Sequence, residues 1–316
     1  MTTARSAEAL VIGESLIDIV TTSSGTHEYP GGSPANVAYG LSKLGTETAL
    51  WTALGDDRLG AIVRAHLDSA GVEVLEWAKP LTSTSTANVQ LADDGSAEYE
   101  FSVDWSIQEV NLPWLPSLLH IGSAAAFTDP GCQAVENAVL QCAGKSIVTF
   151  DPNIRPELIP PHRESLAAFE RIAAMANVVK LSDEDAHWLF PGRSNSEVAE
   201  HILTLGPDLV VITRGALGAM LTSADTAIMV PPVPTTVADT IGAGDSYMAA
   251  LIFSILAAPD AAYGAVSLER MGRVAAAAAA ITVGRSGANP PFLAELEEVL
   301  IQQRPTGSSL TPSLPH

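Results

Sequence analysis

Short apolar runs alternate with stretches of helical periodicity along most of the chain after residue 117. Four of these runs have the length and composition of buried strands, and they cover residues 118–121, 146–150, 178–181 and 209–213. A loop and a helical pattern follow each of them. This rhythm predicts right-handed βαβ units and therefore an α/β fold, with a central, mostly parallel sheet flanked by helices on both faces.

The N-terminal part opens with a similar pattern. Residues 9–13 predict a buried strand, and the polar–apolar alternation over residues 14–20 predicts a half-exposed one. Ser33 is expected to cap the next helix, because a serine side chain can accept from a backbone N–H and Pro34 suits the first helical position. The helical pattern then continues over residues 35–44.

The period changes to two between residues 84 and 103. Residues 87–91 and 97–103 alternate around a turn at residues 93–95, which predicts a hairpin with one polar face. Because this hairpin interrupts an otherwise α/β pattern, we expect it to join a segment from about residue 14 to 30 in a small β-sheet lid.

The rest of the chain adds no second domain. No linker and no internal repeat divides it, so residues 1–303 are expected to form one domain with the lid inserted in its core. Residues 304–316 are rich in Pro, Ser and Thr, a composition that predicts disorder.

The net charge of the chain limits the classes of partner that it is expected to bind. With 36 acidic and 16 basic residues, the formal net charge is −20. Nucleic acid and anionic membranes both require a basic footprint, so neither is an expected partner. A small neutral ligand is not excluded, and an anionic ligand would need a local positive site such as a helix N-terminus.

The cysteines and the apolar segments favour a reducing, cytoplasmic setting. Cys132 and Cys142 fit no metal or disulfide pattern and are expected to be buried free thiols in a helix. The first eight residues lack the apolar core of a signal peptide, and the alanine run at residues 275–280 is too short to span a bilayer. The seven histidines lack metal-ligand spacing.

The strongest chemical signal is a glycine-rich segment, Asp239-Thr-Ile-Gly-Ala-Gly-Asp245, which precedes an apolar helix over residues 246–256. Backbone amides from Ile241 to Gly244 at a helix N-terminus would form an anion site. A carboxylate beside such a site suits proton abstraction from a hydroxyl that attacks a phosphate. The residues alone leave open an ordinary helix cap by Asp239 or Thr240.

A second glycine motif, Gly31-Gly-Ser-Pro-Ala-Asn36, brings backbone close to a ligand at the start of a helix, and Asn36 offers both a donor and an acceptor. With residues 37–45, it resembles the N-terminal signature of the PfkB (ribokinase-like) family of sugar kinases. Residues 239–245 resemble the C-terminal signature. The resemblance runs from about residue 10 to 290.

This resemblance implies a ribokinase-like fold and an ATP- and Mg²⁺-dependent sugar kinase. The catalytic residues that it implies are Asp245 as the base, the anion-binding Gly242, Ala243 and Gly244, and Arg155. The substrate-binding residues that it implies are Asp18, Gly31, Gly32, Asn36 and Asn153. Asp18 would accept from two sugar hydroxyls, and Arg155, in Asp151-Pro-Asn-Ile-Arg155, would neutralise the moving phosphoryl group.

The same resemblance implies a nucleotide site. Its residues are Lys180, Ser182, Thr213, Gly215, Gly218, Thr240, Gly242 and Gly244, with residues 275–287 beside the adenine. Asp185 stands where many relatives have a glutamate, so its contact with Mg²⁺ is expected to pass through water. Some family members bind K⁺ through carbonyls near Asp239 and Ile241. Whether this chain does so, and whether it forms a homodimer through the lid, is open.

Fructose is the first expected substrate, because the motifs at residues 31–36, 151–155 and 180–182 most resemble fructokinases. Kinases of 2-keto-3-deoxygluconate, of ribose and of nucleosides share the frame and remain alternatives. A non-catalytic sugar- or nucleotide-binding protein is the alternative of another class, and the retained Asp245 argues against it. A nicotinamide dehydrogenase would need a Gly-x-Gly-x-x-Gly fingerprint after the first strand, which is missing.

Overall fold

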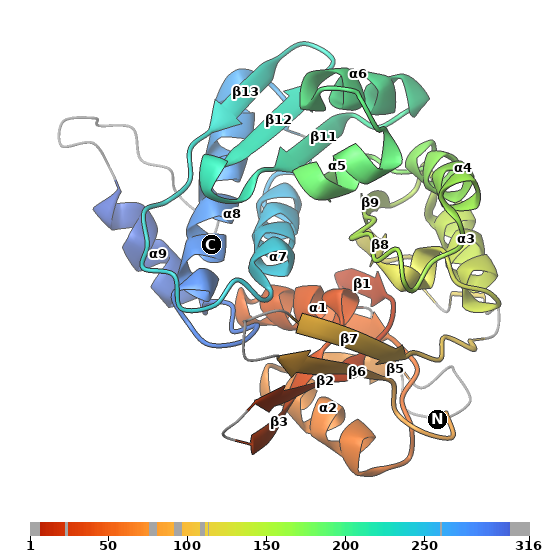
Figure 1. Ribbon diagram of the computed structural model, residues 1–316. Helices are drawn as coiled ribbons and strands as arrows, with labels where there is room; N and C mark the ends of the chain where they lie inside the picture. Colours follow the sequence, from red (N-terminus) through yellow and green to blue (C-terminus); the bar gives the residue numbers. More distant parts are fainter. Residues whose placement is uncertain are drawn as a thin grey trace.

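The larger of two sheets forms the centre of the protein (Figure 1). The computed structural model describes residues 7–22, 25–75, 81–91, 97–107, 111–112, 114–259 and 261–303. The sheet has nine strands in the order β13-β12-β11-β10-β9-β8-β1-β4-β5. Neighbouring strands are parallel except at β11–β12 and β12–β13. The predicted α/β fold is thereby confirmed.

The strands of this sheet are β1 (Ala9–Ile12), β4 (Thr48–Trp51), β5 (Glu73–Leu75), β8 (Leu118–Gly122), β9 (Ile147–Asp151), β10 (Val178–Ser182), β11 (Leu209–Thr213), β12 (Ala219–Ser223) and β13 (Ala227–Val230). The five strands expected from the apolar runs are present within one or two residues of their predicted bounds. The pattern did not single out β4, β5, β12 and β13. All four stand at or next to an edge of the sheet, where runs are short and partly polar.

Helices cover both faces of the large sheet. They are α1 (Ser33–Lys43), α2 (Arg58–Ser69), α3 (Gly131–Cys142), α4 (His162–Ala173), α5 (Asp183–Leu189), α6 (Asn195–Leu205), α7 (Ala243–Leu256), α8 (Ala265–Val283) and α9 (Leu293–Gln302), with short 3₁₀ turns at Ala124–Ala126 and Gly215–Leu217. Successive strand residues alternate between the two faces: Leu10 and Ile12 pack with α3 to α6, whereas Ala9 and Val11 pack with α1, α2, α7 and α8.

The second sheet is the expected lid. Its four strands, in the order β3-β2-β6-β7, are β2 (Leu16–Thr22), β3 (Gly25–Gly31), β6 (Thr86–Leu91) and β7 (Ala97–Ser102). In Figure 1 they lie together at one end of the molecule, beside α1 and α2. The predicted hairpin is therefore confirmed, while its turn at residues 93–95 and the tail at 304–316 lie outside the described residues.

Several local predictions need correction. The strand expected at residues 14–20 begins only at Leu16, and Glu14 is buried in the turn before it. Cys142 is buried as expected, but Cys132 is only half-buried, because it lies near the start of α3. None of the described helices is long and apolar enough to cross a bilayer.

Candidate functional site

Asp245 lies where the N-termini of two helices meet. It occupies the first turn of α7, and α1 packs against that helix. The hydroxyl of Ser33 donates to Asp245 Oδ1 at 2.6 Å, and Asn36 Nδ2 donates to Oδ2 at 2.9 Å. Both donors come from the first turn of α1. The two predicted glycine motifs, about 200 residues apart in sequence, therefore converge on one carboxylate.

The loop before α7 is shaped for close approach. Gly242 precedes the helix with a φ of 74°, and a Cβ there would come within 2.6 Å of Ala288. The carboxylate of Asp239 accepts from the N–H groups of Ile241 and Gly287 and so ties this loop to the segment after α8. The amides of Ile241 and Ala243 are thus already bonded, to Asp239 and to the carbonyl oxygen of Thr240, so those of Gly242 and Gly244 are the candidates to bind an anion.

The alternative of an ordinary helix cap is wrong for this loop. Gly242 occupies the N-cap position, and no side chain caps the helix there. Asp239 accepts from Ile241, which lies before the helix. Asp245 is half-buried and oriented by α1. The first turn of α7 is therefore free to present its dipole to a ligand.

The glycines of the first motif make room for a lid carboxylate. A Cβ at Gly31 would overlap Asp18 Oδ2, and a Cβ at Gly32, whose φ is 97°, would lie 2.7 Å from the carbonyl oxygen of Glu14. Asp18 lies on β2, which pairs with β3 just before α1. These glycines therefore bring the lid, the first strand and α1 together at one point.

Ser33 does not cap α1, contrary to the expectation. Gly32 holds the N-cap position and Ser33 is the first helical residue, so its hydroxyl makes no capping bond. The hydroxyl points across to Asp245 instead. Sequence reasoning missed this contact because a serine before a proline is also the usual pattern of a helix start.

Asp18 lies close enough to Asp245 for their charges to interact. Burial and the nearby charge of Asp245 raise the pKa of Asp18 to about 6, and Arg155 partly offsets this rise. Three predicted site residues from distant parts of the sequence are thus close enough for their charges to interact. Arg155 is exposed and donates to the carbonyl oxygen of Ile154.

A buried ion pair lies beside the α7 loop. Lys180 Nζ is 2.6 Å from Asp151 Oδ2, with both side chains almost fully buried. The same nitrogen would lie 3.3 Å from a Cβ at Gly244. Burial lowers the pKa of Lys180, but Asp151, Asp185 and Asp245 more than offset this, so that pKa is raised and the lysine is charged. A fixed positive charge therefore stands next to the candidate anion site.

Asp185 organises the loop after β9. It accepts from the backbone N–H of Ser182 in a reciprocal capping box and from the N–H of Ile154. Its neighbour in that loop, Asn153, has a left-handed φ of 38°. Since both oxygens of Asp185 already accept from amides, this carboxylate fixes the Asp151–Arg155 loop.

The predicted nucleotide loop follows β11. Thr213 ends that strand, and Gly215 and Gly218 have positive φ angles of 49° and 85°. A Cβ at Gly215 would meet open space, but one at Gly218 would overlap the Val230 carbonyl oxygen. The glycine at 218 is therefore required by packing against β13, whereas the one at 215 leaves the loop open.

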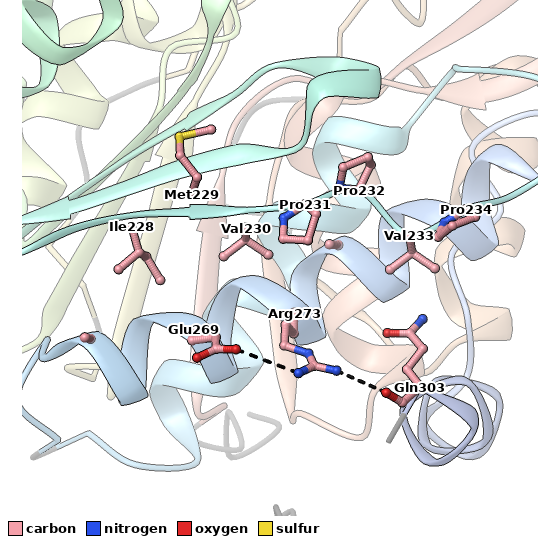
Figure 2. A pocket seen from close by; sticks show the side chains of 12 residues that line it. Ile228, Met229, Val230, Pro231, Pro232, Val233, Pro234, Glu269, Arg273 and Gln303 are labelled. Atoms are coloured by element: carbon pink, nitrogen blue, oxygen red, sulfur yellow. Dashed lines mark hydrogen bonds and ion pairs between the residues drawn. The ribbon is translucent and has the colours of Figure 1, made fainter. Parts of the chain in front are cut away.

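A cavity of about 660 Å³ lies beside this loop, between the end of β13 and helices α8 and α9. Figure 2 shows its wall formed by residues 228–234, with Arg273 reaching from α8 to Glu269 and to the carbonyl oxygen of Gln303. Ala276 of α8 also lines it. Its lining is mostly aliphatic and proline side chains, which suits a flat, weakly polar ring.

Glu14 is a candidate site residue that sequence reasoning missed. It is buried, accepts from the N–H of Ala125, and bonds Ser123, whose φ is 57°. Burial raises its pKa, and Asp245 adds to this. Its position directly after a buried strand, at the edge where ligands bind in α/β sheets, was the available signal. Among the described residues no cluster of three or more His, Cys, Asp or Glu could hold a metal ion.

Comparison with known proteins agrees with this geometry. Residues 6–295 match the family described as pfkB family carbohydrate kinase. A fructokinase from Rhizobium leguminosarum bv. trifolii is 33% identical over 258 residues, which cover 78% of this chain and 79% of that protein. A fructokinase from Salmonella typhimurium is 32% identical over 266 residues, covering 79% and 85% of the two chains.

The fold is also that of solved kinases. A double-mutant fructokinase from Vibrio cholerae O395, with fructose, ADP and a potassium ion bound, aligns with a TM-score of 0.81 at 25% identity, covering 94% of this chain and 99% of that one. The sequence-based expectation of a ribokinase-like fold is confirmed. Because the family match spans most of the sequence and includes both glycine motifs, the chain belongs to the pfkB family of carbohydrate kinases.

Proposed function

We propose that the protein transfers the γ-phosphoryl group of ATP to a hydroxyl of a sugar, with fructose as the first candidate. The observation that carries this proposal is the Asp245 carboxylate, held by Ser33 and Asn36 between two helix N-termini. A base beside an anion site is the minimum machinery for attack of a hydroxyl on a phosphoryl group. The fructokinase relatives support the choice of fructose.

In this mechanism Asp245 accepts the proton of the attacking hydroxyl. A bond forms between the sugar oxygen and the γ-phosphorus while the bond to the bridging oxygen of ADP breaks. The amides of Gly242 and Gly244, the N-terminus of α7 at Ala243, and Lys180 stabilise the charge on the phosphoryl oxygens. Arg155, whose charge also acts on Asp18, would neutralise the moving phosphoryl group.

The nucleotide would lie along the carboxyl ends of β10 and β11. Ser182 and Thr213 stand at that edge, Gly215 leaves room beside it, and Thr240 lies in the loop before α7. We place the adenine in the cavity that Val230 and Ala276 help to line, of which Figure 2 shows the wall at residues 228–234. The sugar would lie under the lid, against Asp18, Gly32 and Asn153.

Hydrogen bonds that already occupy the nearby carboxylates determine how this chain would hold Mg²⁺ and K⁺. Mg²⁺ bound to ATP would neutralise phosphate charge and orient the γ-phosphoryl group. Both oxygens of Asp185 accept from amides, so this residue would hold the ion through water. The carboxylate of Asp239 is likewise bonded, so K⁺, if used, would bind carbonyl oxygens near Asp239 and Ile241.

A panel of sugars tests the proposal. ADP release should be measured with MgATP and fructose, 2-keto-3-deoxygluconate, ribose or a nucleoside, at equal concentration. We expect the highest kcat/KM with fructose, and loss of activity in excess EDTA because free ATP lacks the neutralising ion. Preference for another member of the panel would correct the substrate, and sugar or ATP binding without ADP release would indicate a non-catalytic binding protein.

The raised pKa of Asp18 predicts how sugar binding depends on pH. A carboxyl with a pKa of about 6 loses its charge as the pH falls through that value, and with it part of its capacity to accept from hydroxyls. The KM for the sugar should therefore rise below about pH 6. Asp18→Asn is the matched control, since its KM should be raised at every pH without this dependence. An unchanged pH profile in Asp18→Asn would assign the titration to another group.

A further inference from the structure

The contact between Ser33 and Asp245 is unusual for a serine at a helix start. A serine before a helix normally accepts from a backbone N–H of the first turn. Here Gly32 takes the N-cap position, Ser33 is the first helical residue, and the N–H of Asn36 donates to the carbonyl oxygen of Gly32 instead of to a side chain. The half-buried Ser33 hydroxyl is therefore available for a partner outside its own helix, and it donates to Asp245 Oδ1 at 2.6 Å.

We propose that Ser33 is a positioning residue that holds the Asp245 carboxylate in its reactive orientation before and after proton transfer. This inference rests on the proposed role of Asp245 as the base. The amide of Asn36 donates to Oδ2, but an amide N–H can only donate. A hydroxyl carries one donor and two acceptor lone pairs, so it can donate to the carboxylate and then turn to accept from the protonated acid.

The surroundings explain why a neutral group suits this position. The charges that interact with Asp245 come from several elements: the carboxylates of Glu14, Asp18 and Asp151, and the ammonium of Lys180. Lys180 is already paired with Asp151. A further cation in place of Ser33 would hold the carboxylate too firmly in its charged form, whereas a hydroxyl orients it without adding charge.

The packing between α1 and α7 keeps this contact short. A Cβ at Gly40 of α1 would lie only 2.9 Å from the side chain of Ala249 on α7, so the two helices approach closely one turn beyond the site. Ser33 and Asp245 are fixed on these helices, which makes their separation a property of the scaffold rather than of a mobile loop.

The test compares Ser33→Ala with Ser33→Thr and with a matched control, Ser42→Ala. Ser42 is on the same helix and its hydroxyl also donates over 2.6 Å, but to the carbonyl oxygen of Ala70, away from the site. We expect Ser33→Ala to lower kcat about tenfold to a hundredfold, with unchanged KM for the sugar and for ATP, since the lost bond acts on the base. Ser33→Thr should restore most of kcat, and Ser42→Ala should keep it.

A double-mutant measurement keeps the inference falsifiable if threonine does not fit. In an Asp245→Ala background, Ser33→Ala should not lower the residual kcat further, because the residue acts only through the carboxylate. Equal effects of Ser33→Ala with and without Asp245, or a wild-type kcat in Ser33→Ala, would overturn the inference. If the wild-type protein phosphorylated no sugar, the proposed function would fail instead, so the two failures are distinguishable.

Discussion

Replacing Asp245 with asparagine should lower kcat by about 10²–10⁴ while ATP binding is retained. The amide has nearly the same shape as the carboxylate but cannot accept the proton of the sugar hydroxyl. Gly242, Gly244 and Lys180 are unchanged in the variant, so the phosphate contacts remain. The measurement is kcat from ADP release at saturating sugar and MgATP, together with ATP affinity measured by calorimetry without sugar.

The contacts around Asp245 make this substitution interpretable. The amide of an asparagine can still accept from one of the two present donors, and the Ser33 hydroxyl can rotate to accept from its NH₂ group. The local fold should therefore persist, and an unchanged Tm is the control. If the variant kept more than about a tenth of the wild-type kcat, another group would be the base.

The fold was predictable wherever the local pattern was strong. Buried parallel strands such as β10 and β11 are nearly continuous apolar runs, because helices cover both of their faces. The edge strand β13 has exposed residues in alternation, and β5 has only three residues. Such strands are stabilised by pairing with neighbours that lie elsewhere in the sequence, so a local pattern does not indicate them.

The site was predictable as a set of motifs but not as a set of contacts. Gly31 is a glycine because the carboxylate of Asp18 occupies the space of its Cβ, and those residues are on paired strands of the lid. The Lys180–Asp151 pair likewise joins neighbouring strands, β10 and β9. Contacts of this kind depend on strand order and helix packing, which only the complete fold determines.

Replacing the lid carboxylate, Asp18, should have the second large effect, which is on the KM for the sugar. Asp18→Ala should raise the KM for the sugar about tenfold to a thousandfold, because a carboxylate that accepts from two hydroxyls forms charge-assisted bonds of about 1.5–3 kcal/mol each. The KM for ATP should change little, since the proposed nucleotide site follows β10 and β11 on the main sheet. Both constants come from initial rates of ADP release, and ATP affinity without sugar should be unchanged.

In the matched variant, Asp18→Asn, the stability of the fold should increase although the affinity for the sugar decreases. Burial raises the pKa of Asp18 from 3.8 to about 6 in the folded state. Above pH 3.8 the unfolded chain therefore ionises this group more readily, so the charged Asp18 costs folding free energy, and this cost is complete above about pH 6. Removing the charge should raise the Tm at pH 7 to 8 while it weakens sugar binding. A lower Tm together with a raised KM for both the sugar and ATP would instead show that Asp18 holds the lid in place. If neither the Tm nor either KM changed, Asp18 would not belong to the sugar site.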